Sequence, residues 1–433
     1  MRPGGRIQAA IEIIEEILNR HRPASAALSD WGKAHRFAGS GDRSAIGTLV
    51  YDVLRQRNSL GAQMQADTPR ALVLAASPAS FAMTANDIAA VVDGSQHAPK
   101  QISEAEREGI FRDVPKNLPT HIAGDFPEWL TPSLTRAFGD NVEAEGRAMA
   151  VRAPVDMRVN TLEADRETVL EELTHFKPSP TQWSPFGVRI APPAAGKRQA
   201  NVEAEAAHGK GWFEVQDEGS QIAALMVGAK PTDTVLDLCA GAGGKTLALA
   251  AIMQNEGELA AYDASKIQLR PLFDRARRAG VTNIDVLRAG EDAALKALGP
   301  TFDRVLVDAP CTGSGTWRRR PDSKWRLKQR NIAQRQSEQK KVLDLAAHIV
   351  NPGGTLVYVT CSVLPEENGD QVAWFLEQFP DFSVVPYREQ WKAVLPDDVP
   401  APVSADGSSE TLLLTPAQHQ TDGFFIAVLR RKT

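Results

Sequence analysis

Two cysteines, Cys311 and Cys361, are the residues of this sequence with the clearest capacity for chemistry. Each follows a short apolar run, 305–307 before Cys311 and 356–359 before Cys361, which is typical of a buried parallel strand. In an open α/β sheet, ligands bind outside the carboxyl ends of the strands. We therefore expect the two thiols to share one pocket.

Such a pair of thiols can modify a pyrimidine. A cysteine thiolate can add to C6 of the base, which makes C5 nucleophilic enough to accept a methyl group from a sulfonium. The C5 proton must then leave and the thiol must be eliminated, and a second thiol can act as the base or assist release. Asp308, three residues before Cys311, is placed to hydrogen-bond or protonate the base at N3.

Other uses of the cysteines fit the sequence less well. A zinc site requires further Cys or His ligands, and only His348 lies near them in sequence. A redox pair would favour a C-x-x-C motif, which the sequence lacks. The third cysteine, Cys239, has packing residues as neighbours, so we expect it to act as a small buried hydrophobe.

A glycine-rich turn follows the apolar run 235–238 and leads into a predicted helix. It ends as a P-loop does, with 244–246 reading Gly-Lys-Thr, but Cys239 occupies the first glycine position. Thr246 occupies the last glycine position of a dinucleotide fingerprint. A D-x-x-x-G-x-G pattern that begins at Asp237 remains, as used for S-adenosylmethionine. Asp237 can hold the turn or face the sulfonium.

Two further acids stand at the ends of the next two predicted strands. Asp263 closes the second strand and is placed to accept hydrogen bonds from ribose hydroxyls. Asp292 follows the third strand and can reach an adenine amino group. A single acid at a strand end is often only a helix cap. Three acids at successive strand ends indicate a nucleoside-binding edge.

The elements that must position these residues fall into three predicted domains. Residues 1–103 show only helix-spaced apolar patterns, near 7–18 and 44–60, and predict an all-helical domain. Residues 104–211 predict connector helices and a small α+β subdomain, with strands at 157–160 and 187–190, a helix near 164–175 and a polar loop over 192–211. Residues 212–433 alternate strands with helices, which predicts a doubly wound, mostly parallel sheet. Its strands are expected at 234–239, 258–263, 284–288, 304–309 and 355–360, with helices near 244–254, 266–279, 331–350 and 366–378 and antiparallel strands at 382–386 and 423–430.

Charge is distributed unevenly along the 433 residues. The net charge is −5, yet the segment 318–341 holds ten Lys or Arg against two acids. This excess predicts a phosphate-binding patch, although a solvated helix face is the alternative. Its closeness to Cys311 favours RNA binding. The RNA-binding candidates are Arg318, Arg319, Arg320, Lys324 and Arg326.

The composition of the sequence indicates the cellular compartment that we expect for the protein. No run of about 18 apolar residues is present, so we expect no membrane partner. The first residues do not have the pattern of a signal peptide. Three cysteines in so long a chain favour a reducing compartment, and we expect a cytoplasmic monomer.

Together these motifs resemble the bacterial RNA cytosine-C5 methyltransferases of the 16S ribosomal RNA type, which carry a NusB-like N-terminal domain. The stretches that carry the resemblance are 212–221, 237–246, 308–316, 318–322, 360–368 and 421–428, with weaker matches at 36–43 and 49–55. Thr312 stands where serine is usual in the family, which keeps the hydroxyl.

The resemblance implies a fold, a cofactor and roles. The fold would be that of a class I S-adenosylmethionine-dependent methyltransferase, and residues 1–103 would bind RNA. Cys361 would be the nucleophile and Cys311 would assist product release. DNA cytosine methyltransferases use the Pro-Cys thiol instead, which leaves swapped roles open. The implied cofactor-binding residues are Asp237, Cys239, Ala240, Gly241, Ala242, Gly243, Gly244, Lys245, Asp263, Asp292 and Asp308.

Three other functions stay open at this point. A tRNA cytosine-C5 methyltransferase would use the same chemistry on a different RNA. A non-catalytic RNA-binding assembly factor would share the basic segment but would not need two thiols and three strand-end acids. An ATPase would have to bind its nucleotide through residues 244–246.

Overall fold

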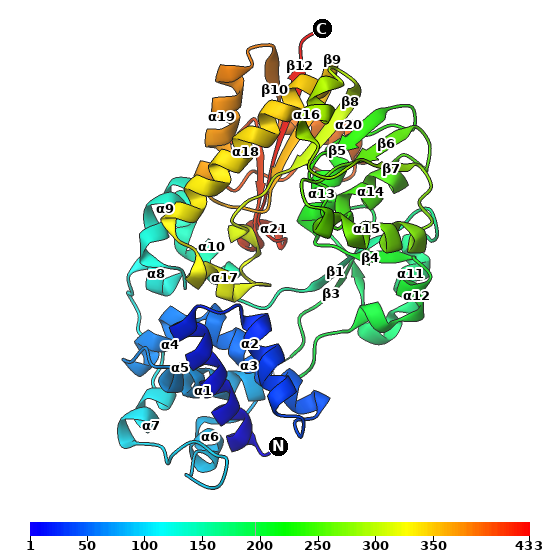
Figure 1. The fold of residues 1–433 in the computed structure, drawn as a ribbon. Coiled ribbons are helices and arrows are strands. Elements are labelled where there is room, and N and C mark those ends of the chain that lie inside the picture. The colour runs from blue at the N-terminus through cyan, green and yellow to red at the C-terminus, as the bar shows by residue number, and fades with distance from the viewer. Residues whose placement is uncertain (195) are drawn as a thin grey trace.

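The structure is a computed structural model that describes residues 1–194 and 196–433. The helices of the N-terminal third form one body, and the large sheet with its covering helices forms another above it (Figure 1). Residue 195 belongs to the polar loop predicted over 192–211 and lies outside the described residues.

The N-terminal body consists of helices that share one apolar core. In α1, Ile7, Ile14 and Ile17 are all buried, as expected from their helical spacing. The predicted helix over 44–60 is interrupted at Gln56, which leaves the α-helical region and separates α3 from α4. The helices are α1 (Pro3–Arg20), α2 (Ala24–Ala34), α3 (Ser40–Arg55), α4 (Arg57–Met64), α5 (Pro69–Phe81), α6 (Ala85–Val91) and α7 (Glu104–Phe111).

A small antiparallel sheet follows the connector helices α8 (Thr120–Ala123), α9 (Thr131–Phe138) and α10 (Val142–Met149). Its strand order is β2-β3-β1-β4, and β1 pairs antiparallel with both β3 and β4. The two strands and the helix expected here are present, and β4 was missed because three residues give too short a pattern. The elements are β1 (Val155–Val159), α11 (Arg166–Glu172), β2 (Ser179–Pro180), β3 (Gly187–Ile190), α12 (Ala206–Gly209) and β4 (Phe213–Val215).

The large sheet confirms the doubly wound topology that the strand–helix alternation predicts. Its order is β10-β12-β9-β8-β5-β6-β7, with β11 paired to β12. The five neighbouring strands β9, β8, β5, β6 and β7 are parallel to one another. Strand β12 is antiparallel to its neighbours β9, β10 and β11. The strands are β5 (Thr234–Asp237), β6 (Glu258–Ala261), β7 (Ile284–Val286), β8 (Phe302–Asp308), β9 (Val350–Thr360), β10 (Phe382–Val385), β11 (Leu412–Leu414) and β12 (Phe424–Arg431).

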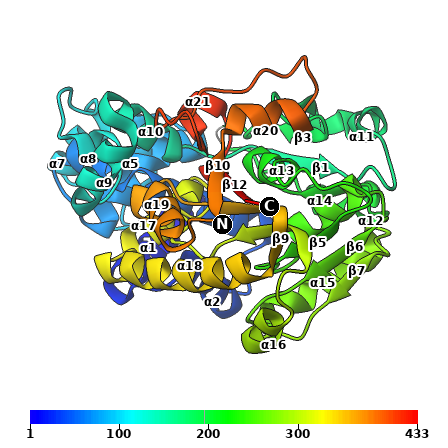
Figure 2. The same cartoon turned by 90° about the horizontal axis from the view of Figure 1, so that it is seen from above.

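Helices cover both faces of this sheet, as Figure 2 shows from above. Successive residues of β8 explain the two layers, because Leu306 packs into one core while Val305 and Val307 pack into the other. One face carries α13 (Glu218–Leu225), α14 (Gly244–Ile252) and α20 (Tyr387–Val394), and the other carries α16 (Asp292–Ala297), α18 (Gln329–Ile349) and α19 (Gly369–Gln378). Helix α15 (Lys266–Arg278) packs beside α14.

The two bodies meet at α17 (Pro321–Arg326), which lies in the predicted basic segment. Trp325 packs against the core of the N-terminal helices, and its Nε1 donates to the carbonyl of Leu54 at 2.6 Å. Lys324 Nζ donates to the carbonyl of Arg55 at 2.6 Å. The helical body is therefore joined to the large sheet by buried side chains as well as by the chain itself. Among the residues described, no helix is both long enough and apolar enough to cross a membrane.

Candidate active site

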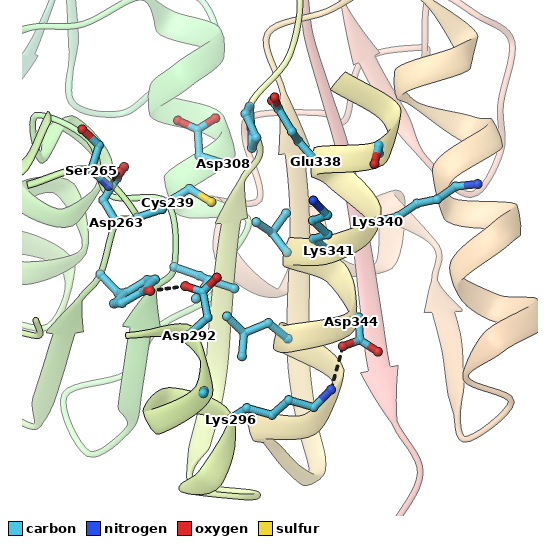
Figure 3. Close-up of a pocket in the computed structure, with 18 of the residues that line it drawn as sticks. Cys239, Asp263, Ser265, Asp292, Lys296, Asp308, Glu338, Lys340, Lys341 and Asp344 are labelled. Carbon is cyan, nitrogen blue, oxygen red and sulfur yellow. Dashed lines mark hydrogen bonds and ion pairs between the residues drawn. The ribbon is translucent and has the colours of Figure 1, made fainter. Parts of the chain in front are cut away.

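The site lies where the strand order reverses, between β5 and β8, at the carboxyl ends of the parallel strands. A cavity of about 830 Å³ opens there. Figure 3 shows Cys239, Asp263, Asp292 and Asp308 on one side of it, and residues of α18 on the other. Lys296 of α16 and Asp344 of α18 form an ion pair of 2.7 Å across one end. Of the three predicted strand-end acids, Asp263 and Asp292 line this cavity and Asp237 does not.

Asp237 ends β5 beneath the glycine-rich turn. Its Oδ2 accepts a hydrogen bond from Thr246 Oγ1 at 2.7 Å, while its buried Oδ1 has no hydrogen-bond partner among the described residues. Burial raises the pKa of Asp237 to about 7, although the Thr246 hydroxyl opposes the rise. A buried carboxylate oxygen without a partner is costly unless a ligand faces it.

The turn itself depends on Gly243, which has φ 83° and begins the helix as the cap of α14. A Cβ at this position would lie 2.2 Å from Leu272 Cδ1, so a side chain would collide with α15. Within the turn, Ala240 is buried while Ala242 is exposed, and the Ala242 carbonyl accepts a hydrogen bond from Arg275. Of the predicted cofactor-binding residues 239–245, only Cys239 lines the cavity.

Asp263 and Asp292 lie in the cavity wall as the sequence predicts. Asp263 Oδ2 accepts from the backbone N–H of Gly241 at 3.0 Å, and Oδ1 accepts from Ser265 N–H at 2.7 Å. Asp263 thus fixes the turn as well as lining the cavity. Asp292 is the first residue of α16 and accepts a hydrogen bond from the Tyr262 hydroxyl. Burial, followed by the Asp292 carboxylate, raises the pKa of Tyr262, which keeps this hydroxyl a donor.

Asp308, at the end of β8, lines the cavity and lies three residues before Cys311. Its Oδ2 accepts from Lys245 Nζ at 2.6 Å, and the Lys245 ammonium also lies 5.1 Å from the Phe424 ring. Burial lowers the pKa of Lys245, but the Asp308 carboxylate more than offsets this and the pKa is raised overall. Lys245 is therefore a charged ammonium that cancels much of the negative charge around it.

The two cysteines of the sequence prediction do lie together. Cys311 Sγ is 3.3 Å from Cys361 Sγ, and all three cysteines are free. The adjacency arises because β8 and β9 pair in parallel, with Asp308 opposite Val359, so that their following loops leave the sheet side by side. The contact with Cys361, followed by burial, raises the pKa of Cys311. The two thiols are therefore adjacent, as predicted, but neither of them lines the cavity described above.

The sequence suggests that Cys239 is a buried packing residue and, by the family resemblance, that it contacts the cofactor; the structure agrees with both positions. It packs against the apolar core of the sheet, and it also lines the cavity. Burial raises the pKa of its thiol well above the usual range, which describes an inert packing residue rather than a nucleophile.

The basic segment is the part of the predicted site that the structure contradicts. Arg318 is 4% exposed and pairs with Asp217 and Asp422. Arg319 pairs with the same two carboxylates and donates to the Pro154 carbonyl at 3.0 Å. Burial would raise the pKa of Asp217, but the two guanidinium groups outweigh it and lower that pKa. The burial of Arg318 argues against its predicted contact with RNA phosphates, whereas Arg319 is held by the same acids but keeps 31% of its side chain exposed.

Lys324 and Arg326 of α17 likewise differ from the expectation. Lys324 is 1% exposed, and burial lowers its pKa to about 7. Its ammonium serves the contact between the two bodies and cannot reach a phosphate. Arg326 is partly exposed and pairs with Asp322 at 3.0 Å. Of the five RNA-binding candidates, only Arg320 is exposed, whereas the other four are buried or partly buried.

The sequence reasoning missed one residue that holds both thiol loops. Glu367 is completely buried and accepts hydrogen bonds from Thr312, Ser362 and Gln339. Its acid stands six residues after Cys361, in a stretch quoted for the family resemblance. A buried acid cannot be told from a surface acid by position alone, so only the structure reveals it.

Comparison with known proteins covers most of the chain. Residues 224–430 match a family model described as 16S rRNA methyltransferase RsmB/F. Residues 126–195 match a model of the RsmF/B-like ferredoxin-like domain. The first match contains the turn, the acids and both thiols, and the second contains the small sheet through β3.

Individual relatives extend the similarity. A probable ribosomal RNA small subunit methyltransferase B of Synechocystis is 31% identical over 313 residues, which are 71% of this chain and 67% of the relative. A probable protein of the same name from Bacillus subtilis is 32% identical over 343 residues, or 76% of this chain and 72% of the relative. The crystal structure of PH0851 is similar with a TM-score of 0.73 and 28% identity, over 100% of this chain and 99% of PH0851.

Proposed function

Because the chain belongs to the 16S rRNA methyltransferase RsmB/F family, we propose that it transfers a methyl group from S-adenosylmethionine to C5 of a cytosine in 16S ribosomal RNA. The class I methyltransferase fold and S-adenosylmethionine as cofactor follow from the family. The observation that carries the choice of C5 is the pair of thiols at 3.3 Å, because this chemistry needs a thiol nucleophile and a second group for release.

The cavity suits S-adenosylmethionine in size and in chemistry. Its volume of about 830 Å³ is sufficient for a nucleoside-sized ligand. Asp263 and Asp292 line the cavity and offer carboxylates to ribose and adenine. Asp237 is 1% exposed and does not line the cavity, but its Oδ1 has no hydrogen-bond partner among the described residues, and we assign this oxygen to the positive charge of the cofactor. These three acids, with the backbone of residues 239–245 and with Asp308, are our proposed cofactor site. When bound, the cofactor supplies a methyl group on a sulfonium.

In the proposed reaction, the Cys361 thiolate forms a bond from Sγ to C6 of the cytosine. The C5–C6 double bond opens, and its electron pair makes C5 able to accept the methyl group. The carboxyl group of Asp308 donates a hydrogen bond to N3 and so stabilises the negative charge that the thiolate brings to the ring. Loss of the C5 proton to a base re-forms the double bond and expels Cys361 as a thiolate. We assign assistance of this release to Cys311. The target base must be unstacked to expose C6.

Two alternatives differ in the RNA or in the activity, and one experiment separates them. Purified protein is incubated with labelled S-adenosylmethionine and with matched transcripts of 16S ribosomal RNA and of tRNA. Label incorporated into 16S RNA supports the proposal, and label confined to tRNA would favour a tRNA methyltransferase. Binding without methyl transfer to any RNA would favour an assembly factor. That residues 1–103 form a NusB-like RNA-binding domain, with boundaries near 104 and 212, stays a prediction.

The affinity for S-adenosylmethionine is expected to fall as the pH is lowered from 8 to 6. Burial raises the pKa of Asp237 from its ordinary value of 3.8 to about 7 in the folded protein. The protonated carboxyl group therefore stabilises the cofactor-free fold below pH 3.8, and this contribution is lost as the pH rises through about 7. A bound sulfonium favours the carboxylate, so protonation opposes binding, by at most about tenfold in Kd per pH unit. Calorimetric titration measures this dependence, and Asp237→Asn should flatten it. An equally steep slope in Asp237→Asn would assign the titration to another group.

RNA binding is expected to depend on the exposed part of the basic segment. Arg320, Lys328 and Arg330 are exposed, and none forms an ion pair within the described part of the chain. In Arg320→Ala/Arg330→Ala, the slope of log Kd against log salt should fall by about 0.7 to 0.9 for each lost phosphate contact. Filter binding across a salt series measures the slope. Arg277→Ala/Lys392→Ala removes the same charge elsewhere on the surface, and an equal effect there would show that the segment has no special role.

A further inference from the structure

The Cys311 and Cys361 thiols are in direct contact, although fifty residues separate them in the chain. Their Sγ atoms are 3.3 Å apart, and the S–S bond of a disulfide is about 2.05 Å long, so the sulfurs need to approach by about 1.2 Å to form one. Both cysteines are free thiols, and both are partly exposed. The pair can therefore react together as well as separately.

The backbone beneath the two thiols has the spacing that a disulfide requires. Strands β8 and β9 are hydrogen-bonded neighbours with Asp308 opposite Val359, and the thiols follow these residues by three and two positions. Neighbouring strands lie about 4.8 Å apart, and the two Cα atoms of a disulfide are usually about 4.4–6.8 Å apart. The two strands therefore need not separate for the bond to form.

The loops that follow these strands are also held side by side. The N–H of Gly315 donates to the Cys361 carbonyl at 3.0 Å, which ties one loop to the other at the cysteine itself. The buried Glu367 carboxylate accepts from the N–H of Thr312 at 2.9 Å and from the Ser362 hydroxyl at 2.6 Å, so it holds the residue after each thiol alike. This restraint keeps each sulfur at a high effective concentration for the other.

Cys239 provides a contrast within the same chain. It is also a free and partly exposed thiol. Within the described part of the chain, however, it forms no hydrogen bond to either of the other two sulfurs. An oxidised Cys239 would therefore have no thiol in contact with which to close a disulfide.

We propose that Cys311 and Cys361 are a site of reversible oxidation, at which a hydroperoxide converts the two thiols into a disulfide and so stops methyl transfer. With hydrogen peroxide, one thiolate attacks a peroxide oxygen, which forms an S–O bond, breaks the O–O bond and releases water once the leaving hydroxide is protonated. The other thiol then displaces the sulfenic oxygen as a second water and forms the S–S bond. The two sulfurs lose two electrons and two protons in all, and the peroxide gains them. Only the loss of methyl transfer rests on the proposed function.

The first test follows the thiols of the full chain without RNA or cofactor. The protein is treated with hydrogen peroxide, denatured and alkylated with iodoacetamide, and its peptides are analysed by mass spectrometry without reduction. We expect a cross-linked peptide that joins Cys311 to Cys361 and is two hydrogens lighter than its parts, while Cys239 is still alkylated. Dithiothreitol should restore all three thiols. Three alkylated thiols after peroxide treatment, or oxidation without the cross-linked peptide, would overturn the proposal.

Matched variants identify the partner of each sulfur. Cys361→Ala leaves Cys311 without its partner, so peroxide should produce a sulfenic acid, which dimedone traps, and no disulfide within the chain. Cys239→Ala keeps the pair and should form the disulfide at the wild-type rate. A disulfide in Cys361→Ala, or its loss in Cys239→Ala, would place Cys239 in the bond and would contradict the proposal.

The second test counts methyl groups transferred to a 16S ribosomal RNA transcript before oxidation, after oxidation and after dithiothreitol. Methyl transfer should fall in proportion to the cross-linked fraction of the protein and return on reduction. Undiminished transfer by fully cross-linked protein would show that the bond is not a switch, and would overturn the proposal. If the untreated protein transfers no methyl group, the proposed function fails and the switch fails with it, while the peptide analysis still reports the disulfide.

Discussion

Cys311→Ala is expected to accumulate a covalent complex of protein and RNA in the presence of S-adenosylmethionine, whereas Cys361→Ala is expected to form none. Without Cys311, the bond between Cys361 and C6 still forms, but release of the product is impaired. Without Cys361, the bond cannot form, and methyl transfer should fall below detection. Turnover of Cys311→Ala should fall by about 10²- to 10⁴-fold, the usual cost of losing a group that transfers a proton. A denaturing gel detects the complex.

The controls of this experiment separate three outcomes. The double variant Cys311→Ala/Cys361→Ala should give no complex, which shows that the retained band requires Cys361. A complex in Cys361→Ala but not in Cys311→Ala would exchange the roles and keep the reaction. No complex in any variant, together with no methyl transfer to any RNA, would favour a non-catalytic assembly factor.

Arg318→Ala is expected to destabilise the fold, not merely to weaken RNA binding. The Arg318 guanidinium pairs with Asp217 and Asp422, whose side chains are 7% and 2% exposed. Removing one partner of a buried ion pair leaves charge uncompensated, at a cost of about 3–5 kcal/mol. Arg319 contacts the same acids and should moderate this loss. Urea unfolding followed by circular dichroism measures the change.

The neighbouring Arg320→Ala provides the matched control for stability. Arg320 is exposed, and its loss should change the free energy of unfolding by less than about 0.5 kcal/mol. Arg318→Ala, in contrast, should lower the urea midpoint of the C-terminal body. If both variants unfold at the same urea concentration as the wild type, the ion pairs of Arg318 contribute nothing measurable to the free energy of unfolding. This result would contradict the prediction that Arg318 stabilises the fold.

The parallel sheet could be predicted because its strands are buried on both faces and read as short apolar runs. The predicted runs at 234–239, 258–263, 304–309 and 355–360 all contain the observed strands or overlap them. The turn and its following helix were predicted for the same reason, with glycines required by backbone geometry. The segment 387–419 was not predicted, because its short helices and β11 acquire their structure from packing on β12.

In the candidate site, the residues at strand ends were predicted correctly, whereas the surroundings of the basic segment and of Glu367 were not, and this difference has a physical cause. Residues at strand ends converge because topology brings strand ends together, so Asp263, Asp292 and the two thiols could be placed from their positions alone. The basic segment could not, since a run of charges does not reveal which acids fold against it. Asp217 and Asp422 lie about one hundred residues from Arg318 in opposite directions along the chain. Glu367 was missed because its donors come from three separate elements.

The measurement that tests the central claim most directly is the release of tritium from C5 of cytosine. A 16S ribosomal RNA transcript labelled with [5-³H]cytidine is incubated with the protein and S-adenosylmethionine, and tritium in water is counted beside methyl groups transferred to the RNA. We expect cofactor-dependent release of one tritium for each methyl group transferred, and none with Cys361→Ala. Methyl transfer without tritium release would show that another atom is methylated, and would contradict the proposed reaction.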